Sequence, residues 1–374
     1  MDVRTGTDRL AAGEGPSLTS APVAVLCHPA SVDRNLVPVQ EVLRRRGARI
    51  VSLLGPEHGI DAAAQDMEGV EDHAPADVAT PVYSLYGDEF ESLRPTPAMF
   101  HDAAWLVVDL QDVGARYYTY VWTALMAVEE ALKCNLRVLI LDRPNPLGGT
   151  DAWVEGGRVE PGEESFVGFH DVAVRHGMTL AEIVTMAIHE RGVEGTDRVT
   201  VLECAGWDRG MLFSETGLPW VLPSPNMPTL ETALVYPGQC LLEGTNFSEG
   251  RGTTRPFELF GAPFIDGEAL RGDLSPADFP GLGLRVVHFK PTFQKHQHAS
   301  CGGLQLHVRA PREVRSLRSS YALLAACWNR WPESCDWRTE RYEFVDDRPA
   351  IDLLAGGRWL RDMVESGAQA ADMV

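Results

Sequence analysis

Several common sequence features are missing from this chain of 374 residues, and each absence excludes a class of protein. No apolar run approaches the roughly 20 residues that a membrane-spanning helix needs, which argues against a membrane protein. The N-terminal segment carries charges and glycines where a secretory signal would need about 7–15 consecutive apolar residues. The sequence therefore predicts a cytoplasmic protein.

Positive charge is also scarce. Lysine occurs only at Lys133, Lys290 and Lys295, and the formal net charge is −20. A nucleic-acid-binding protein needs a basic stripe that displaces counterions from phosphates, and this chain offers none. The expected partners therefore do not include nucleic acid.

Local motifs for metals, cofactors and disulfides are absent too. The odd number of cysteines, seven, and the lack of a C-x-x-C pair indicate reduced, mostly structural thiols. The segment "CHPASVDRN" stands where a dinucleotide-binding G-x-G-x-x-G would follow the first strand. Neither H-E-x-x-H nor G-x-S-x-G occurs, so we expect no metal, no cofactor and no serine hydrolase.

What is present is an alternation of strands and helices. Apolar runs in "PVAVLCH", "ARIVSLLG", "AAWLVVDLQD" and "LRVLILDRPNP" have the character of parallel strands buried on both faces. Amphipathic segments in "LVPVQEVLRRRG" and "TALMAVEEALKCN" separate them. This order predicts right-handed βαβ units and a doubly wound sheet.

The length suggests two domains. We expect an α/β protein: a flexible N-terminus over residues 1–20, a Rossmann-like parallel-sheet domain over 21–215 and a smaller mixed α/β C-terminal domain over 216–374. Thr179 and Glu182 fit the capping box of a helix at the end of the first domain. The second domain should contain ordered loops over 220–264, strands in "LRVVHFKP" and "GGLQLHVRA", a helix over 316–331 and a C-terminal segment over 351–364.

Polar side chains follow three of the predicted strands. Glu57 and His58 lie in "GPEHG", Asp112 lies in "DLQDVGARYYTY", and Asp142 opens "DRPNPLGG". Each has a structural alternative, since Asp142 and Arg143 could form a turn ion pair, Asp112 could cap a helix and His58 could cap a loop. Because functional groups of doubly wound sheets gather beyond the carboxyl ends of the strands, three such loops together favour a site.

The residues of these loops suit a sugar ligand. A carboxylate at Asp112, a guanidinium at Arg116 and the ring of Tyr118 can bind hydroxyl edges and C–H faces. The structural alternative is a surface pair of Asp112 and Arg116 beside core tyrosines.

The second domain offers the segment "LEGTNFSEGRGTTRPFE". Its glycine-rich backbone can form an anion-binding nest, and either Arg251 or Arg255 can bind a carboxylate through two parallel hydrogen bonds. Further acid candidates in this segment are Glu243, Glu249 and Glu258.

These loops, in this order, resemble the NamZ-type exo-β-N-acetylmuramidases, a glycoside hydrolase family formerly described as a domain of unknown function. The resemblance covers residues from about 23 to about 360. It rests on the strings "GPEHG", "PVYSLYG", "DLQDVGARYYTY", "DRPNPLGG", "SFVGF", "HGMT", "PSPNMPT", "YPGQCLLEGTNFSEGRGTTRPFE", "CGG" and "IDLLAGG".

The resemblance implies a Rossmann-like domain, a smaller α/β domain and a site in the cleft between them. It implies release of N-acetylmuramic acid from the non-reducing end of peptidoglycan fragments. The catalytic glutamate of the family falls on Glu57. The residues that match its polar cleft are His58, Asp112, Arg116, Tyr118, Asn145, His176, Asn226, Glu243, Asn246 and Arg251.

The chain departs from the family at two positions, with His28 where Asn is usual and Ile60 where Phe is usual, and residues 61–70 are less glycine-rich than in the family. A cytoplasmic member would act on disaccharides or short muropeptides during wall recycling. Arg251 or Arg116 could hold the lactyl carboxylate of muramic acid.

Several mechanisms fit the sequence. With Glu57 as acid/base, the second carboxylate could be Asp112, Glu243 or Glu249, acting with retention or inversion, or the 2-acetamido group of the substrate could be the nucleophile. Two other functions are alternatives: a metal-dependent hydrolase using His58 and Asp112, and a sugar-binding protein without catalysis.

Overall fold

The computed structural model describes residues 2–61 and 80–373, which form two compact units. The chain passes between them several times, whereas the sequence predicts one boundary at 215/216. Unit 1 comprises Met1–Gly114, Tyr118–Thr150 and Gly177–Pro225, and unit 2 comprises Ala115–Tyr117, Asp151–His176 and Asn226–Val374.

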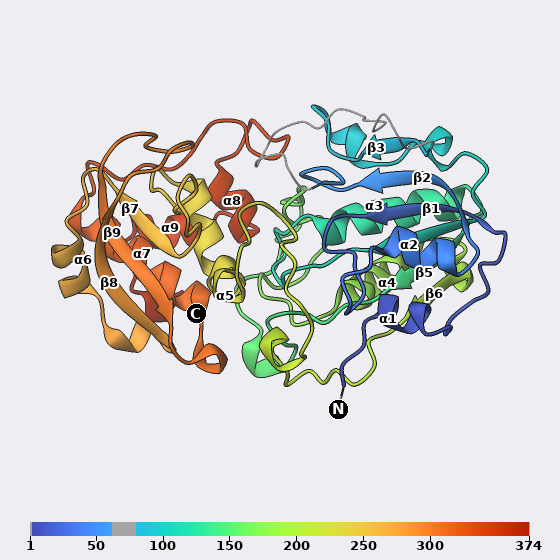
Figure 1. Cartoon of the computed structure of the whole chain (residues 1–374). Helices are drawn as coiled ribbons and strands as arrows, with labels where there is room; N and C mark the ends of the chain where they lie inside the picture. Colours follow the sequence, from blue (N-terminus) through green and yellow to red (C-terminus); the bar gives the residue numbers. More distant parts are fainter. Residues whose placement is uncertain (1, 62–79, 374) are drawn as a thin grey trace. The chain divides into compact units, whose positions relative to one another are not determined.

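Unit 1 is built on a six-stranded parallel sheet with the order β3-β2-β1-β4-β5-β6 (Figure 1). This is the strand order of the Rossmann fold, so the predicted fold class is confirmed. The chain order reverses between β1 and β4, which makes their carboxyl ends the topological switch point. The strands are β1 Pro22–Cys27, β2 Arg49–Gly55, β3 Val82–Ser84, β4 Trp105–Asp109, β5 Arg137–Leu141 and β6 Val199–Leu202.

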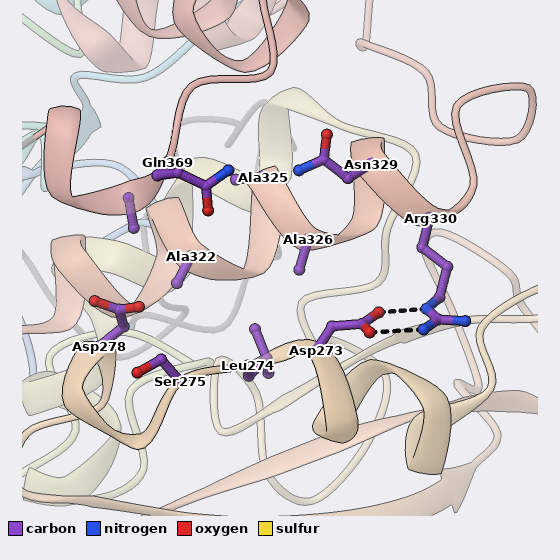
Figure 2. Close-up of a pocket in the computed structure, with 11 residues that line it drawn as sticks. Asp273, Leu274, Ser275, Asp278, Ala322, Ala325, Ala326, Asn329, Arg330 and Gln369 are labelled. Atoms are coloured by element: carbon purple, nitrogen blue, oxygen red, sulfur yellow. Dashed lines mark hydrogen bonds and ion pairs between the residues drawn. The ribbon is translucent and has the colours of Figure 1, made fainter.

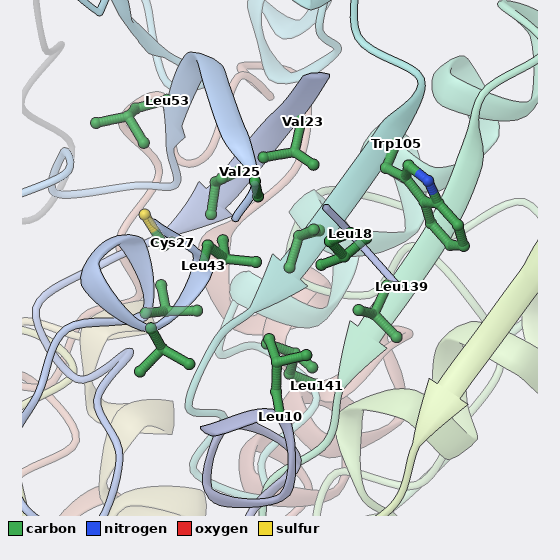
Figure 3. Packing of buried hydrophobic residues seen from close by; sticks show 14 of the residues in the cluster. Leu10, Leu18, Val23, Val25, Cys27, Leu43, Leu53, Trp105, Leu139 and Leu141 are labelled. Atoms are coloured by element: carbon green, nitrogen blue, oxygen red, sulfur yellow. The ribbon is translucent and has the colours of Figure 1, made fainter. Parts of the chain in front are cut away.

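Helices cover both faces of this sheet. On one face, Val23, Val25 and Cys27 of β1 pack against Leu10 and Leu43 in a continuous apolar cluster (Figure 3). The other face lies against α3, in which nearly every residue is buried, and α4 packs against α3. The helices of unit 1 are α1 Gly6–Ala11, α2 Val39–Arg45, α3 Tyr120–Lys133 and α4 Leu180–Glu190.

Capping explains where two of these helices begin. The predicted capping box of Thr179 and Glu182 is present at α4. A second one, formed by Thr5 and Asp8, starts α1 and buries Leu10, so the prediction of a flexible segment over residues 1–20 is wrong for this part. A capping box satisfies two otherwise unpaired N–H groups and is enough to start a short helix that packs on a core.

Unit 2 combines an antiparallel sheet of order β7-β9-β8 with helices. The predicted strands and the helix over 316–331 are present, and the C-terminal segment over 351–364 forms the two helices α8 and α9. The predicted loops over 220–264 also contain α5 and β7. Its elements are α5 Leu230–Gln239, β7 Leu259–Ala262, α6 Gly267–Asp273, β8 Leu282–Phe289, β9 Cys301–Val308, α7 Ser316–Arg330, α8 Ala350–Ala355 and α9 Trp359–Glu365.

Helix α5 is not predicted from the sequence because Pro237 lies inside it and breaks the helical pattern. Its first turn is nevertheless capped, since the Thr229 hydroxyl accepts a hydrogen bond from the N–H of Thr232 at 3.1 Å. The helix also packs along α7, and tertiary packing of this kind supplies most of the stability of short helices.

None of the helices within the described ranges is both long and apolar enough to cross a bilayer.

Candidate active site

The polar side chains predicted from the strand ends do lie along one edge of the unit 1 sheet. All six strands are parallel, so the residues that follow β1, β2, β4 and β5 share that edge. His28 and Asp112 follow the two strands that flank the switch point, and Glu57 follows the neighbouring strand β2. This is the edge at which α/β sheets bind ligands.

The turn that carries Glu57 is tightly constrained. The N–H of Gly59 donates to the carbonyl of Pro56 at 3.0 Å, and His58 has a φ of +70°. A side chain at Gly55 would meet the backbone nitrogen of Ile60 at 2.6 Å, so the turn needs glycine there. A left-handed histidine stores conformational strain of the kind that collects at functional sites.

Glu57 and His58 are almost buried, with 6% and 8% of their surface exposed. One carboxyl oxygen of Glu57, Oε2, accepts a hydrogen bond from the hydroxyl of Thr119 at 2.5 Å. The other, Oε1, lies 4.0 Å from His58 Nε2, which is beyond hydrogen-bond length. The site therefore holds a shielded carboxyl group with one oxygen fixed by a neutral donor.

His28 lies directly after β1 at the switch point, and its hydrogen bonds define one protonation state. Its Nε2 accepts a hydrogen bond from the N–H of Gln111 at 2.9 Å, so Nδ1 carries the proton and donates to the carbonyl of Pro223 at 3.3 Å. Burial, assisted by the nearby charge of Arg143, lowers the pKa of His28 to about 3. His28 is therefore neutral and holds the backbone of its neighbours in place.

The tyrosines of this region are core residues with polar ends. Tyr120 donates to the carbonyl of Pro223 at 2.7 Å, the same acceptor that His28 uses. The ring centroid of Tyr118 lies 4.7 Å from that of Tyr120. Burial raises the pKa of both phenols above the ordinary value, so they remain protonated donors.

Asp112 and Asn145 form hydrogen bonds with backbone groups of their own loops, and Asn145 also with a backbone carbonyl just before α4. Asp112 Oδ2 accepts from the N–H of Gly114 at 2.7 Å. Asn145 donates to the carbonyl of Met178 and accepts from the N–H of Leu147, both at 2.9 Å. A side chain at Gly114 would come within 2.4 Å of Asn145 Oδ1, so these two loops need glycine there to approach each other. This geometry is that of loop-shaping residues.

The sequence allowed an ion pair between Asp142 and Arg143 as a structural alternative, and this pairing is wrong. Arg143 forms its ion pair with Asp109, at 2.5 and 2.9 Å, and not with Asp142. Asp142 instead accepts a hydrogen bond from the N–H of Ala181 at the start of α4, at 3.2 Å. Burial raises the pKa of Asp142 to about 7, although the Thr179 hydroxyl and two backbone N–H groups act in the opposite direction.

The raised pKa of Asp142 predicts that the free energy of unfolding falls as pH rises. In the unfolded chain an aspartate has a pKa of about 3.9, so between that value and about 7 the folded state binds more protons than the unfolded one. The free energy of unfolding should therefore decrease as pH rises through this window. Asp142→Asn keeps an acceptor for Ala181 and should flatten the decrease, as measured by urea unfolding at several pH values. An identical slope in both proteins would contradict the assignment.

Arg116 belongs to unit 2 and is fully buried. Its guanidinium donates to the carbonyls of Gly157 at 2.8 Å, Val172 at 2.9 Å and Leu354 at 2.8 Å. Burial lowers its pKa to about 10. The predicted alternative of a surface pair with Asp112 is therefore wrong, and the arginine ties three backbone segments of unit 2 together.

Unit 2 also contains a cluster of paired charges. Glu243, on the 3-10 helix η6 Cys240–Gly244, accepts from Arg251 Nη2 and from the hydroxyl of Tyr342, both at 2.7 Å. Burial alone would raise the pKa of Glu243, but Arg251, Tyr342 and Lys295 outweigh it and hold that pKa below the ordinary value. Glu243 is therefore an ionised carboxylate at neutral pH.

Glu249 completes this cluster. Its Oε1 lies 3.5 Å from Arg251 Nε, and its Oε2 lies 2.8 Å from Lys295 Nζ. The guanidinium of Arg251 also sits 5.1 Å above the ring of Phe257. The cluster thus contains two carboxylates and two cations, all nearly buried except for the lysine.

The remaining predicted residues have structural contacts or lie buried in unit 2. Asn246 donates to the carbonyl of Ser334 at 2.8 Å and accepts from the N–H of Asp336 at 3.1 Å. His176 and Asn226 are 5% and 8% exposed. Arg255 lies 3.3 Å from Glu258, whose carboxylate accepts from the Thr232 hydroxyl at 2.7 Å.

The structure thus groups the predicted residues by unit. It brings Glu57 and His58 together at the unit 1 edge, and Glu243, Glu249 and Arg251 together in unit 2. Sequence reasoning missed Thr119 and Tyr342 as partners of the two central glutamates. Thr119 could have been noticed as a threonine preceding a helical pattern, but Tyr342, which is 99 residues from Glu243, carries no local signal.

A separate pocket of about 490 Å³ lies in unit 2 between α7 and the segment that ends α6 (Figure 2). The small side chains on its α7 side leave the space open; they are Ala322, Ala325 and Ala326. Arg330 closes one end by pairing with Asp273. Among the described residues that line it, none belongs to the predicted site.

No group of three or more histidine, cysteine, aspartate or glutamate side chains in residues 2–61 and 80–373 is arranged to hold a metal ion.

Known proteins resemble this chain over both of its units. Residues 23–231 match the model of the N-terminal part of exo-β-N-acetylmuramidase NamZ, and residues 234–374 match that of its C-terminal part. The peptidoglycan β-N-acetylmuramidase NamZ of Bacillus subtilis strain 168 is 37% identical over 373 residues, which are 100% of this chain and 86% of the relative.

Solved structures agree with the fold. A crystal structure of a DUF1343 family protein from Bacteroides fragilis has a TM-score of 0.85 at 28% identity, covering 99% of this chain and 93% of that one. A second DUF1343 family protein from the same organism has a TM-score of 0.75 at 25% identity, covering 100% and 93%. The chain therefore belongs to the family of the exo-β-N-acetylmuramidase NamZ.

Proposed function

We propose that this protein is a glycosidase that releases N-acetylmuramic acid from the non-reducing end of peptidoglycan fragments. The observation that supports this most is the shielded carboxyl group of Glu57 on a strained turn at the ligand-binding edge of the sheet. The relative with 37% identity is a peptidoglycan β-N-acetylmuramidase, which supports the same reaction.

In this proposal Glu57 donates a proton to the glycosidic oxygen as the bond to the leaving sugar breaks. A buried carboxyl group at the ligand-binding edge can act as a general acid when it contacts the glycosidic oxygen. Charge develops on the muramyl ring in an oxocarbenium-like transition state, which a second, ionised carboxylate stabilises. Glu243 is our first candidate for that role because its partners keep it ionised, and Asp112 is the second.

The remaining predicted residues are proposed to bind the substrate. They are His58, Arg116, Tyr118, Asn145, His176, Asn226, Asn246, Glu249 and Arg251. For Arg116, Asn145 and Asn246 this contribution would be indirect, since these side chains donate hydrogen bonds to backbone carbonyls.

The proposal is tested with a chromogenic β-N-acetylmuramide and the matching β-N-acetylglucosaminide, each with and without chelator. We expect turnover of the muramide that is faster than that of the glucosaminide and insensitive to chelator. No turnover of either sugar by the folded protein would refute the proposal. Loss of activity on chelation, restored by metal, would favour the metal-dependent hydrolase instead.

Arg251 is proposed to bind the lactyl carboxylate that distinguishes muramic acid from N-acetylglucosamine. A guanidinium binds carboxylates bidentately, and that of Arg251 already contacts the carboxylates of Glu243 and Glu249. The guanidinium of Arg116 donates to three backbone carbonyls instead. Arg251→Lys should therefore lower kcat/KM for the muramide by about 10-fold or more while changing that for the glucosaminide little. An unchanged ratio of the two would remove Arg251 from this role.

We further propose that the substrates are disaccharides or short muropeptides formed during recycling of the bacterial cell wall in the cytoplasm. A carboxyl group that is 6% exposed suits the end of a short chain better than the middle of a polymer. Comparing product release from purified disaccharide and from intact wall polymer tests the substrate, and cell fractionation tests the location.

A further inference from the structure

Thr119 occupies an unusual place in the fold. It precedes α3 as its N-cap residue, and its carbonyl accepts from the N–H groups of Trp122 and Thr123, both at 3.0 Å. An N-cap threonine ordinarily uses its side chain to accept a hydrogen bond from the first turn. The Thr119 side chain makes no such bond and instead donates its hydroxyl to Glu57 Oε2.

The contact is shielded from water. Thr119 is 4% exposed and Glu57 is 6% exposed, and the two residues lie 62 positions apart in the chain. Hydrogen bonds between buried groups are electrostatically stronger than those in water. A fixed donor on Oε2 also makes the two carboxyl oxygens of Glu57 inequivalent.

Glu57 Oε1 faces a different environment. His58 Nε2 lies 4.0 Å from it, and the His58 ring stands edge-on to Tyr120 with centroids 6.5 Å apart. No hydrogen bond holds His58 to Oε1 at that distance. A proton can therefore be held on Oε1 without displacing the Thr119 contact.

We propose that Thr119 is a positioning residue for Glu57, whose hydroxyl fixes Oε2 and leaves Oε1 to exchange the proton with the substrate. This inference rests on the proposed role of Glu57 as acid/base. In the forward step the proton passes from Oε1 to the glycosidic oxygen as the glycosidic bond breaks. The Thr119 hydroxyl then stabilises the carboxylate that remains, until a water molecule adds its oxygen to the anomeric carbon and the proton that it releases restores the acid.

Removal of the hydroxyl has a measurable consequence. Thr119→Val keeps the shape of the side chain but deletes the donor, whereas Thr119→Ser keeps the donor. A hydrogen bond to the ionised form of a carboxyl group favours ionisation. Its loss should therefore move the limb of the pH–rate profile that reports Glu57 to higher pH. We expect a shift of about one pH unit and a fall in kcat of roughly 10-fold in Thr119→Val, with both restored in Thr119→Ser.

The matched control is Thr123→Val. Thr123 is fully buried one turn further along α3, and its hydroxyl donates to the carbonyl of Thr119 at 3.3 Å and not to Glu57. This variant loses a buried hydroxyl from the same helix, so it reports what a purely structural loss does. We expect its pH–rate profile to coincide with that of the wild type.

The experiment measures kcat and KM for the chromogenic β-N-acetylmuramide across pH for these proteins. It adds thermal unfolding of Thr119→Val, of Glu57→Ala, which removes the acceptor of the hydrogen bond, and of the double variant. A shift confined to Thr119→Val, with non-additive unfolding free energies, supports the proposal. A pH–rate profile unchanged in Thr119→Val, or additive unfolding free energies, overturns it.

The two proposals fail differently. If the folded wild type does not turn over the muramide, or if Glu57→Gln retains full activity, the proposed function or the role of Glu57 is wrong. If turnover depends on Glu57 but Thr119→Val behaves like the wild type, only the role of Thr119 is wrong.

Discussion

Glu57→Gln should lower kcat for a β-N-acetylmuramide by roughly 10²–10⁴-fold, the range that general acid–base catalysis supplies. Glutamine matches glutamate in size but has no proton to donate to the glycosidic oxygen. Its amide oxygen can still accept the hydrogen bond from Thr119, so the turn should keep its shape. KM should change far less than kcat, because the substitution removes an interaction needed in the transition state.

A suitable control for this variant is Glu258→Gln. Glu258 is 4% exposed, as shielded as Glu57, and it also accepts a hydrogen bond from a threonine, Thr232, at 2.7 Å. The control therefore carries the same chemical change at a comparably buried position. If both variants lost activity equally, the loss would reflect stability. A Glu57→Gln protein within a few fold of the wild type would remove Glu57 from acid/base catalysis.

The largest effect on stability is expected for Arg116→Met. Its guanidinium satisfies the carbonyls of Gly157, Val172 and Leu354, and no part of the side chain is exposed. Methionine fills much of the volume but leaves three buried acceptors without a donor. Removal of one partner from a buried charged network costs about 3–5 kcal/mol, so unfolding in urea should begin at a clearly lower concentration.

Two further variants make this prediction specific. Arg116→Lys keeps the charge but cannot reproduce the planar fork, so its loss of stability should fall between those of the wild type and Arg116→Met. Arg158→Ala removes an exposed arginine that pairs with Asp171 at the surface, and it should cost less than about 1 kcal/mol. Equal midpoints for Arg116→Met and Arg158→Ala would contradict a structural role for Arg116.

The sequence alone determines four of the six strands of the unit 1 sheet, whereas β3 and β6 are not predicted. The β1, β2, β4 and β5 strands are continuous apolar runs, and such runs separated by helical periods leave a parallel sheet as the way to bury both faces. Because parallel strands end at one edge, the sequence also places Glu57, Asp112 and Asp142 along that edge. Local chemistry likewise marks the start of α4, where Thr179 and Glu182 form the predicted capping box.

Elements with weak local patterns depended on tertiary packing. Helix α5 contains Pro237 and is held against α7, while α1 is only six residues long and is stabilised by burial of Leu10. Short helices gain little from their own hydrogen bonds, so their formation depends on the surface that covers them. Composition and periodicity over a few residues therefore do not reveal them.

The tertiary structure alone decided the partners of the central charged groups. The sequence allowed Arg116 to bind a surface carboxylate or a ligand, and the fold instead gives it three buried carbonyls. Likewise, Glu57 meets Thr119 and Glu243 meets Tyr342 across 62 and 99 residues of chain. Local patterns encode which segments form helices and strands, whereas pairing of distant side chains depends on how those segments pack, which no short-range pattern specifies.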